Sequence, residues 1–83
     1  MVTYYVALPF VRLENGGLAP GQAVECPHSS AAIRRADAMS RSGMNAGAVA
    51  FSRSGSPELG DFDEAVVLKS FGDVWDDFAC GAA

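Results

Sequence analysis

The chain has too little histidine, cysteine and lysine for several common kinds of site. Its 83 residues include one histidine, two cysteines and one lysine. These cannot complete a four-ligand zinc site, and two cysteines are too few for a disulfide framework. Direct binding of DNA or RNA depends on neutralising phosphates with Lys and Arg, and the formal net charge is −4. We therefore expect no metal and no direct nucleic-acid contact.

Motifs for catalysis and membrane insertion are also missing. There is no GxGxxG or GxxxxGK[ST] phosphate loop and no glycine-rich nucleophile turn. No apolar run approaches the roughly 18 residues needed to cross a bilayer. The N-terminal stretch MVTYYVALPF lacks the basic leader and cleavage site of a secretion signal. These absences predict a cytoplasmic, non-enzymatic protein that binds no cofactor and no membrane.

The triplet Cys26-Pro27-His28 is the part of the chain most like a catalytic site. A thiol near a helix N-terminus and an imidazolium has its thiolate favoured. Adjacent side chains seldom face each other as nucleophile and base, however, and no second histidine exists. We expect Cys26 and Cys80 to be free thiols in a reducing cytoplasm. A small thiol redox protein using Cys26, and a Cys26–Cys80 bridge, remain as alternatives.

Length and patterning indicate one small α+β domain covering residues 1–83. Strands are expected at 2–13, 45–53 and 64–71, and a short strand or ordered loop at 18–25. We place Pro9 at an edge or a bend because it cannot donate to a ladder. The continuous apolar centre of 64–71 predicts a central strand with both faces covered. The result is an antiparallel three- to four-stranded sheet with one amphipathic helix packed on one face.

The helix is predicted over residues 30–42, with Ser29 or Ser30 as its N-cap and Gly43 as a left-handed stop. One side of it is narrow and rich in small residues, and the strand at 45–53 carries alternating alanines that would let it lie close. A second, short C-terminal helix is expected from Asp73. A domain this small buries only about 60–65% of the unfolded chain's surface, so a homodimer or a partner complex would add stability.

Charge is distributed unevenly along the chain. Residues 1–57 carry five arginines against three acids, a net of +2, and residues 58–83 carry seven acids against one lysine, a net of −6. In one interpretation the acids only solubilise a loop and a tail, while the aromatics fill the core. In the other, which is our functional hypothesis, an acidic surface with aromatic anchors binds a basic protein partner. The candidate binding residues are Glu58, Asp61, Phe62, Asp63, Glu64, Asp73, Trp75, Asp76, Asp77 and Phe78.

Two resemblances accompany these patterns. The run MNAGAVAFSRSG leading to EAVVLKSFG looks like part of a SPOR-type peptidoglycan-binding repeat, over about half of the chain. In size, acidity and lack of catalytic apparatus the chain resembles the small inhibitors of phages and mobile elements, the anti-CRISPR proteins among them. That second resemblance implies a nucleic-acid mimic, whose acids face outward together and occupy the nucleic-acid-binding surface of a partner complex. The acids that carry it are Glu58, Asp61, Asp63, Glu64, Asp73, Asp76 and Asp77.

Overall fold

The sheet is built on its two longest strands. The computed structural model describes residues 2–56 and 58–75. Strands β1 (Val2–Arg12) and β4 (Gly47–Ser56) pair antiparallel along almost their whole length, from Val2 opposite Gly55 to Phe10 opposite Gly47. β1 is rich in β-branched and aromatic residues, which suit a pleated, half-buried surface, and β4 alternates small residues with larger ones from Ala48 to Ser54. They form the centre of the fold.

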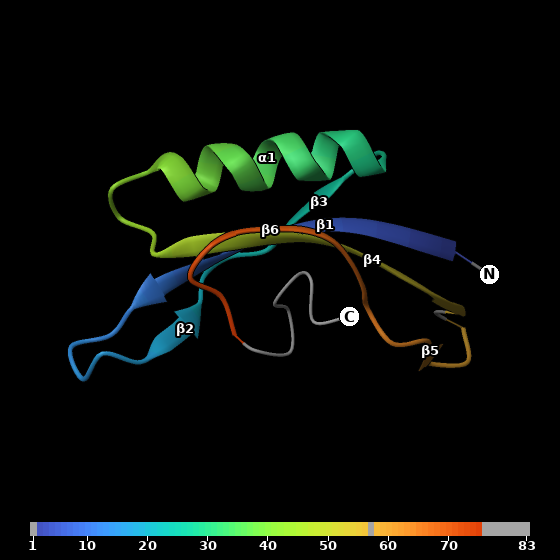
Figure 1. Ribbon diagram of the computed structural model, residues 1–83. Coiled ribbons are helices and arrows are strands. Elements are labelled where there is room, and N and C mark those ends of the chain that lie inside the picture. Colours follow the sequence, from blue (N-terminus) through green and yellow to red (C-terminus); the bar gives the residue numbers. More distant parts are fainter. Residues whose placement is uncertain (1, 57, 76–83) are drawn as a thin grey trace.

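Each side of this central pair is completed by two short pieces of chain. β2 (Leu18–Pro20) and β3 (Val24–Cys26) both pair with β1. β5 (Asp61–Phe62) and β6 (Val66–Gly72) both pair with β4. All pairings are antiparallel, and the sheet is curled (Figure 1). The predicted α+β class is confirmed, but within residues 2–56 and 58–75 the sheet has six strands rather than three or four, because each edge is divided.

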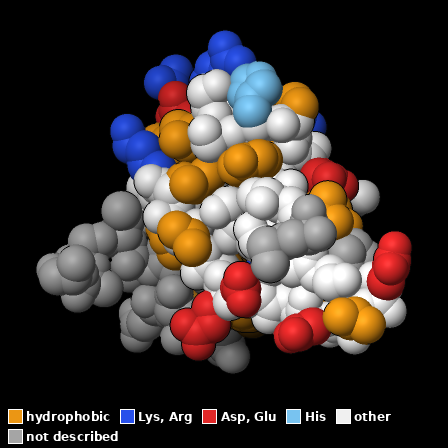
Figure 2. Space-filling model, turned by 90° about the vertical axis from the view of Figure 1, so that its right-hand side faces the viewer, with side chains coloured by type: hydrophobic (Ala, Val, Ile, Leu, Met, Phe, Trp, Pro, Cys, Tyr) orange, Lys and Arg blue, Asp and Glu red, His pale blue; other side chains and the backbone are white. Residues whose placement is uncertain are grey.

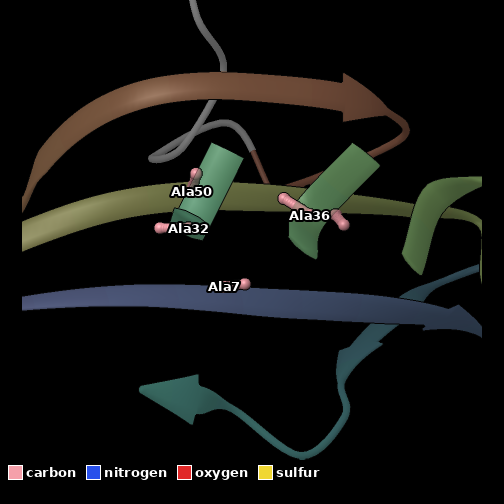
Figure 3. Close-up of a cluster of buried hydrophobic side chains, with 5 residues drawn as sticks. Ala7, Ala32, Ala36 and Ala50 are labelled. Atoms are coloured by element: carbon pink, nitrogen blue, oxygen red, sulfur yellow. The ribbon is translucent and has the colours of Figure 1, made fainter. Parts of the chain in front are cut away.

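One helix, α1 (Ser29–Arg41), lies across a single face of the sheet (Figure 1). The contact is made by alanines from both elements, and small side chains let the helix and the sheet approach closely (Figure 3). The predicted alanine-lined packing is confirmed. The fully buried alanines of this layer are Ala7, Ala32, Ala36, Ala48 and Ala50.

The helix begins differently from the prediction. His28 is the N-cap: the backbone is still extended there, with φ −158°, and becomes helical at Ser29. The His28 Nδ1 atom accepts a hydrogen bond from the Ala31 N–H at 3.2 Å and lies 2.9 Å from the Ser30 hydroxyl oxygen. The prediction of Ser29 or Ser30 as N-cap is therefore wrong, because both serines already lie inside the helix.

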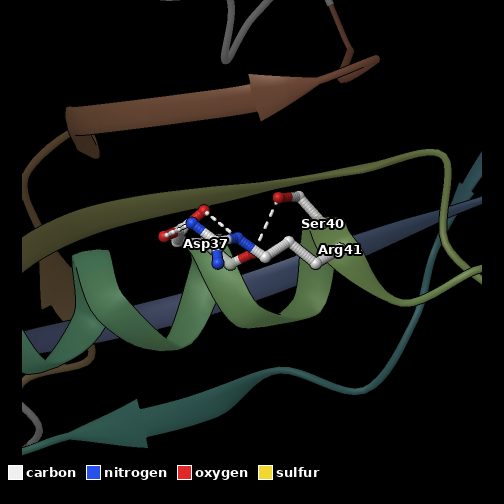
Figure 4. A network of polar contacts seen from close by, with 3 residues as sticks. All are labelled: Asp37, Ser40 and Arg41. Carbon is white, nitrogen blue, oxygen red and sulfur yellow. Dashed lines mark hydrogen bonds and ion pairs between the residues drawn. The ribbon is translucent and has the colours of Figure 1, made fainter.

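The helix ends without a left-handed residue. The C-cap is Ser42, in extended conformation, and the Asn45 side-chain amide donates to the Met39 carbonyl at 3.0 Å. The prediction of Gly43 as a left-handed stop is wrong. The Asn45 side chain donates to the Met39 carbonyl, which a left-handed cap would otherwise satisfy through a backbone N–H. In the last turns Arg41 pairs with the Asp37 carboxylate and the Ser40 hydroxyl donates to the Asp37 carbonyl (Figure 4).

Pro9 lies in a central strand, so the prediction of an edge or a bend is wrong. It sits opposite Ala48 and is buried. On the other side of β1, the pairing with β3 ends at Ala7 and the pairing with β2 starts at Phe10. The missing N–H of Pro9 falls in this gap, where only its carbonyl is used, as acceptor for the Gly21 N–H at 2.8 Å.

β6 lies at an edge, which corrects the prediction of a central strand. Among the described strands it pairs with β4 alone. The register shifts between Ala50 and Phe51, which marks a bulge, and Val66 is 60% exposed. Its apolar run therefore reflects an irregular edge rather than burial on both faces. Residues 76–83 of the predicted C-terminal helix lie outside the described residues, and residues 73–75 are not helical.

Candidate interaction surface

The structure divides the predicted binding residues between the two ends of β4. At one end Phe62 pairs with Gly55, and at the other Gly72 pairs with Gly47 immediately before Asp73. Eight residue steps along β4 separate these ends, or about 26 Å at the usual rise of an extended strand. The described acids among the predicted binding residues thus form two groups rather than one surface. Asp76, Asp77 and Phe78 lie outside the described residues.

At the Asp73 end the predicted binding residues hold the chain onto the sheet. The Asp73 carboxylate pairs with Arg12 of β1, and the Asp73 N–H donates to the Ala46 carbonyl at 3.1 Å. Trp75 packs on Phe10 with the ring centres 5.2 Å apart, and its indole N–H donates to the Leu18 carbonyl at 3.1 Å. These contacts reach β1, β2 and the residue before β4. They show that Asp73 and Trp75 stabilise the fold.

At the other end a group of exposed side chains surrounds the turn between β4 and β5. None of its four carboxylates forms an ion pair with another described residue. We call this group the hairpin surface; it consists of Glu58, Leu59, Asp61, Phe62, Asp63 and Glu64. Four unpaired negative charges around two apolar side chains make it the part of the described chain best suited to bind a basic partner.

Phe62 is held in a fixed position within the hairpin surface. Its ring lies over Gly55, where a Cβ atom would overlap it, and its centre is 6.1 Å from that of Tyr4. The Arg53 guanidinium lies 5.8 Å from the ring centre, and its Nε donates to the Asp63 carbonyl at 3.0 Å. Even so, Phe62 remains 36% exposed. An aromatic side chain that is already ordered loses little conformational freedom on binding.

Leu59 was not among the residues predicted from the sequence. It lies in the turn at residues 58–60, which ends in Gly60 with φ +66°, and is 81% exposed. A large apolar residue in a stretch otherwise rich in glycine, serine and proline was the available indication. Tyr4 and Arg53 were also missed, because their proximity to Phe62 arises only from strand pairing.

The uneven charge of the sequence becomes a separation in space. Figure 2 looks onto the molecule from the end that carries β5: basic side chains gather over the helix, and most acidic ones lie over the sheet below, with hydrophobic side chains among them. The exposed basic residues of α1 are Arg34, Arg35 and Arg41, of which Arg41 is paired with Asp37. Such a dipolar surface orients an approaching charged partner.

In the Cys26-Pro27-His28 triplet, the thiol and the imidazole make separate contacts. The Cys26 thiol is partly buried and lies 3.7 Å from the Val24 carbonyl, while the His28 Nδ1 serves as the helix cap. Cys80 lies outside the described residues. Within the described ranges no group of three His, Cys, Asp or Glu side chains is placed to hold a metal ion. The geometry offers the thiol hypothesis no support beyond the sequence.

Comparison with protein-family models, with curated proteins and with solved structures finds no match for this chain. In residues 2–56 and 58–75, no helix combines the length and apolar character that crossing a membrane requires. The chemistry of the hairpin surface is therefore the available indication of function.

Proposed function

We propose that this protein is a small, non-enzymatic interaction module whose hairpin surface binds a basic surface of a partner protein. The observation that carries the proposal is the arrangement of four unpaired carboxylates around exposed Leu59 and Phe62. Protein interfaces commonly combine an apolar or aromatic centre with a polar rim. In this arrangement the carboxylates guide the encounter, and burial of the two apolar side chains supplies affinity.

The basic surface belongs, in this proposal, to a protein that handles nucleic acid. Asp61 and Asp63 are two residues apart in an extended segment, so their Cα atoms are separated by about 7 Å. That is similar to the spacing of successive phosphates along a nucleic-acid strand. A partner bound in this way would lose access to its nucleic acid, and the module would act as an inhibitor.

The test is affinity capture with immobilised full-length protein and a matched pair of charge variants. Glu58→Lys/Asp61→Lys reverses two charges on the hairpin surface, and Glu14→Lys/Glu25→Lys makes the same change at exposed positions elsewhere. We expect the wild type and the second variant to retain the same basic proteins at low salt and release them as salt rises. The first variant should retain none of them.

The retained protein is then purified and titrated with wild type, the charge variants and Phe62→Ala. Loss of Phe62 should weaken binding at least tenfold without changing net charge, in line with an aromatic anchor at an interface. Equal binding by Glu58→Lys/Asp61→Lys and Glu14→Lys/Glu25→Lys would show that only overall acidity matters, and the hairpin surface would lose its role.

A further inference from the structure

The outer edge of the sheet beside β6 has backbone groups that no described strand takes up. The Asp63 N–H donates to the Ser54 carbonyl at 2.8 Å, and Val66 pairs with Ser52 two residues along β4. In extended chain, successive residues direct their backbone groups to opposite sides. Because Val66 faces Ser52, the backbone groups of the next strand residue, Val67, which lies opposite Phe51, point away from β4. A row of such groups is a template for pairing with another strand.

The side chains on this edge do little to prevent such pairing. Protected edges usually carry prolines or several charges. From Ala65 to Leu68 this edge has neither, and Val66 is 60% exposed. Lys69 is the first charge that follows; its ammonium group lies 5.3 Å from the ring centre of Phe71 and forms no ion pair within the described chain. The edge thus has an uncovered apolar centre and an unpaired cation.

We propose that a second copy of the chain pairs antiparallel with this edge, with Val66 facing Val66 of the second copy on a two-fold axis. Two-fold symmetry then fixes the other pairs. The residue three positions after Val66 in one copy meets the residue three positions before Val66 in the second copy. Lys69 meets Asp63 of the second copy, and Asp63 meets its Lys69. Opposite charges directly across from each other stabilise such a pair of strands.

The register places these side chains on one face of the sheet. Val66 pairs with Ser52 and Lys69 with Ala50, and Asp63 lies beside Ser54. Ala50, Ser52 and Ser54 are every second residue of β4, so all three face the same side of the sheet. Lys69, Val66 and Asp63 beside them therefore share the face on which Ala50 contacts the helix. A self-complementary edge of this kind selects a second copy rather than an unrelated strand. The interface uses Asp63 of the hairpin surface but not Glu58, Leu59 or Phe62. Val66→Lys leaves the whole hairpin surface in place, so loss of the dimer can be told apart from loss of partner binding.

The first test is the solution mass of the full chain, measured by sedimentation over a wide concentration range. The wild type should reach twice the chain mass as concentration rises. Val66→Lys brings two ammonium groups to the axis, where facing Cα atoms are about 4.5 Å apart, and should halve the mass. Val2→Lys is the matched control, because Val2 is 42% exposed on β1 and should leave the mass unchanged. A wild type that stays monomeric, or a Val66→Lys variant that stays dimeric, would overturn the proposal.

The second test is a charge exchange that checks the register. Lys69→Asp alone and Asp63→Lys alone each place like charges opposite each other and should abolish the dimer. The double variant Lys69→Asp/Asp63→Lys restores opposite charges and should restore twice the chain mass. Circular dichroism establishes that each variant is folded. A folded double variant that remains monomeric would refute the two-fold axis at Val66.

Discussion

The two ends of β4 use the same residue types differently. At the Gly47 end, Asp73 and Trp75 contact Arg12, Phe10 and Leu18 across the sheet. At the Gly55 end, the carboxylates of the hairpin surface have no cationic partner in the described chain, although an arginine lies close by. Arg53 stacks on the Phe62 ring and donates to a backbone carbonyl instead.

The difference shows that an acidic and aromatic composition does not by itself define a binding surface. An exposed Asp73 that already pairs with Arg12 must give up that contact before it can meet a partner's cation. A free carboxylate beside an ordered aromatic ring has no such contact to lose. Only the second arrangement combines exposure with unsatisfied charge.

The largest effect is expected at Gly47, where β4 and the chain after β6 approach most closely. A Cβ atom there would overlap the backbone oxygens of Asp73 and Phe71, and backbone atoms cannot move aside cheaply. Gly47→Val should lower the free energy of unfolding by about 3 kcal/mol, as measured by urea denaturation. Gly43→Ala is the control, because nothing lies within 4 Å of its added Cβ. Equal stability of the two variants would contradict the described close approach.

A smaller effect is expected from removing the aromatic side chain at either end. Trp75→Ala loses the packing on buried Phe10 and the hydrogen bond to Leu18, and should lower the free energy of unfolding by about 2 kcal/mol, since Trp75 is only partly buried. Phe62→Ala loses the contact with Tyr4 and should lower the free energy of unfolding by about 1 kcal/mol. Partner binding should respond in the opposite order, with loss at Phe62 and little change at Trp75. Titration of the captured partner protein with both variants measures this order. A reversed order would assign the binding role to Trp75.

The smallest effect on stability is expected from neutralising one carboxylate at each end. Asp73→Asn removes an exposed ion pair with Arg12 and should lower the free energy of unfolding by about 0.5 kcal/mol. A double-mutant cycle with Arg12→Met should assign that difference to the pair. Asp61→Asn should leave the unfolding free energy unchanged while weakening partner binding. Zero coupling in the cycle would mean that Asp73 is as free as Asp61, and the contrast between the ends would disappear.

Local patterns predicted much of the fold. The helix was expected over residues 30–42 and is found at Ser29–Arg41. The alternating alanines at 46, 48 and 50 predicted a close helix contact, which Ala48 and Ala50 make. These features depend on residues near each other in the chain, where periodicity is informative. The capping residue was missed because an imidazole nitrogen took the acceptor role usually filled by serine.

Features that depend on pairing between distant segments were predicted less well. The apolar run at 65–68 was interpreted as a central strand, but strand order depends on which neighbours the other segments leave available. The sequence predicts Pro9 at an edge or a bend, whereas a central strand accommodates it because two short strands leave a gap beside it. The candidate binding residues were grouped by their proximity in sequence, and strand pairing separated them.

By itself the sequence determined the α+β class, the helix and its alanine face, and the concentration of acids in the last third of the chain. These follow from hydrophobic period, turn residues and composition, all of which are local. Only the tertiary structure decided which acids remain free, because an Asp becomes structural when a distant Arg meets it across the sheet, as Arg12 meets Asp73. It likewise decided that β6 lies at an edge with Val66 exposed, because the burial of a strand depends on what packs beside it.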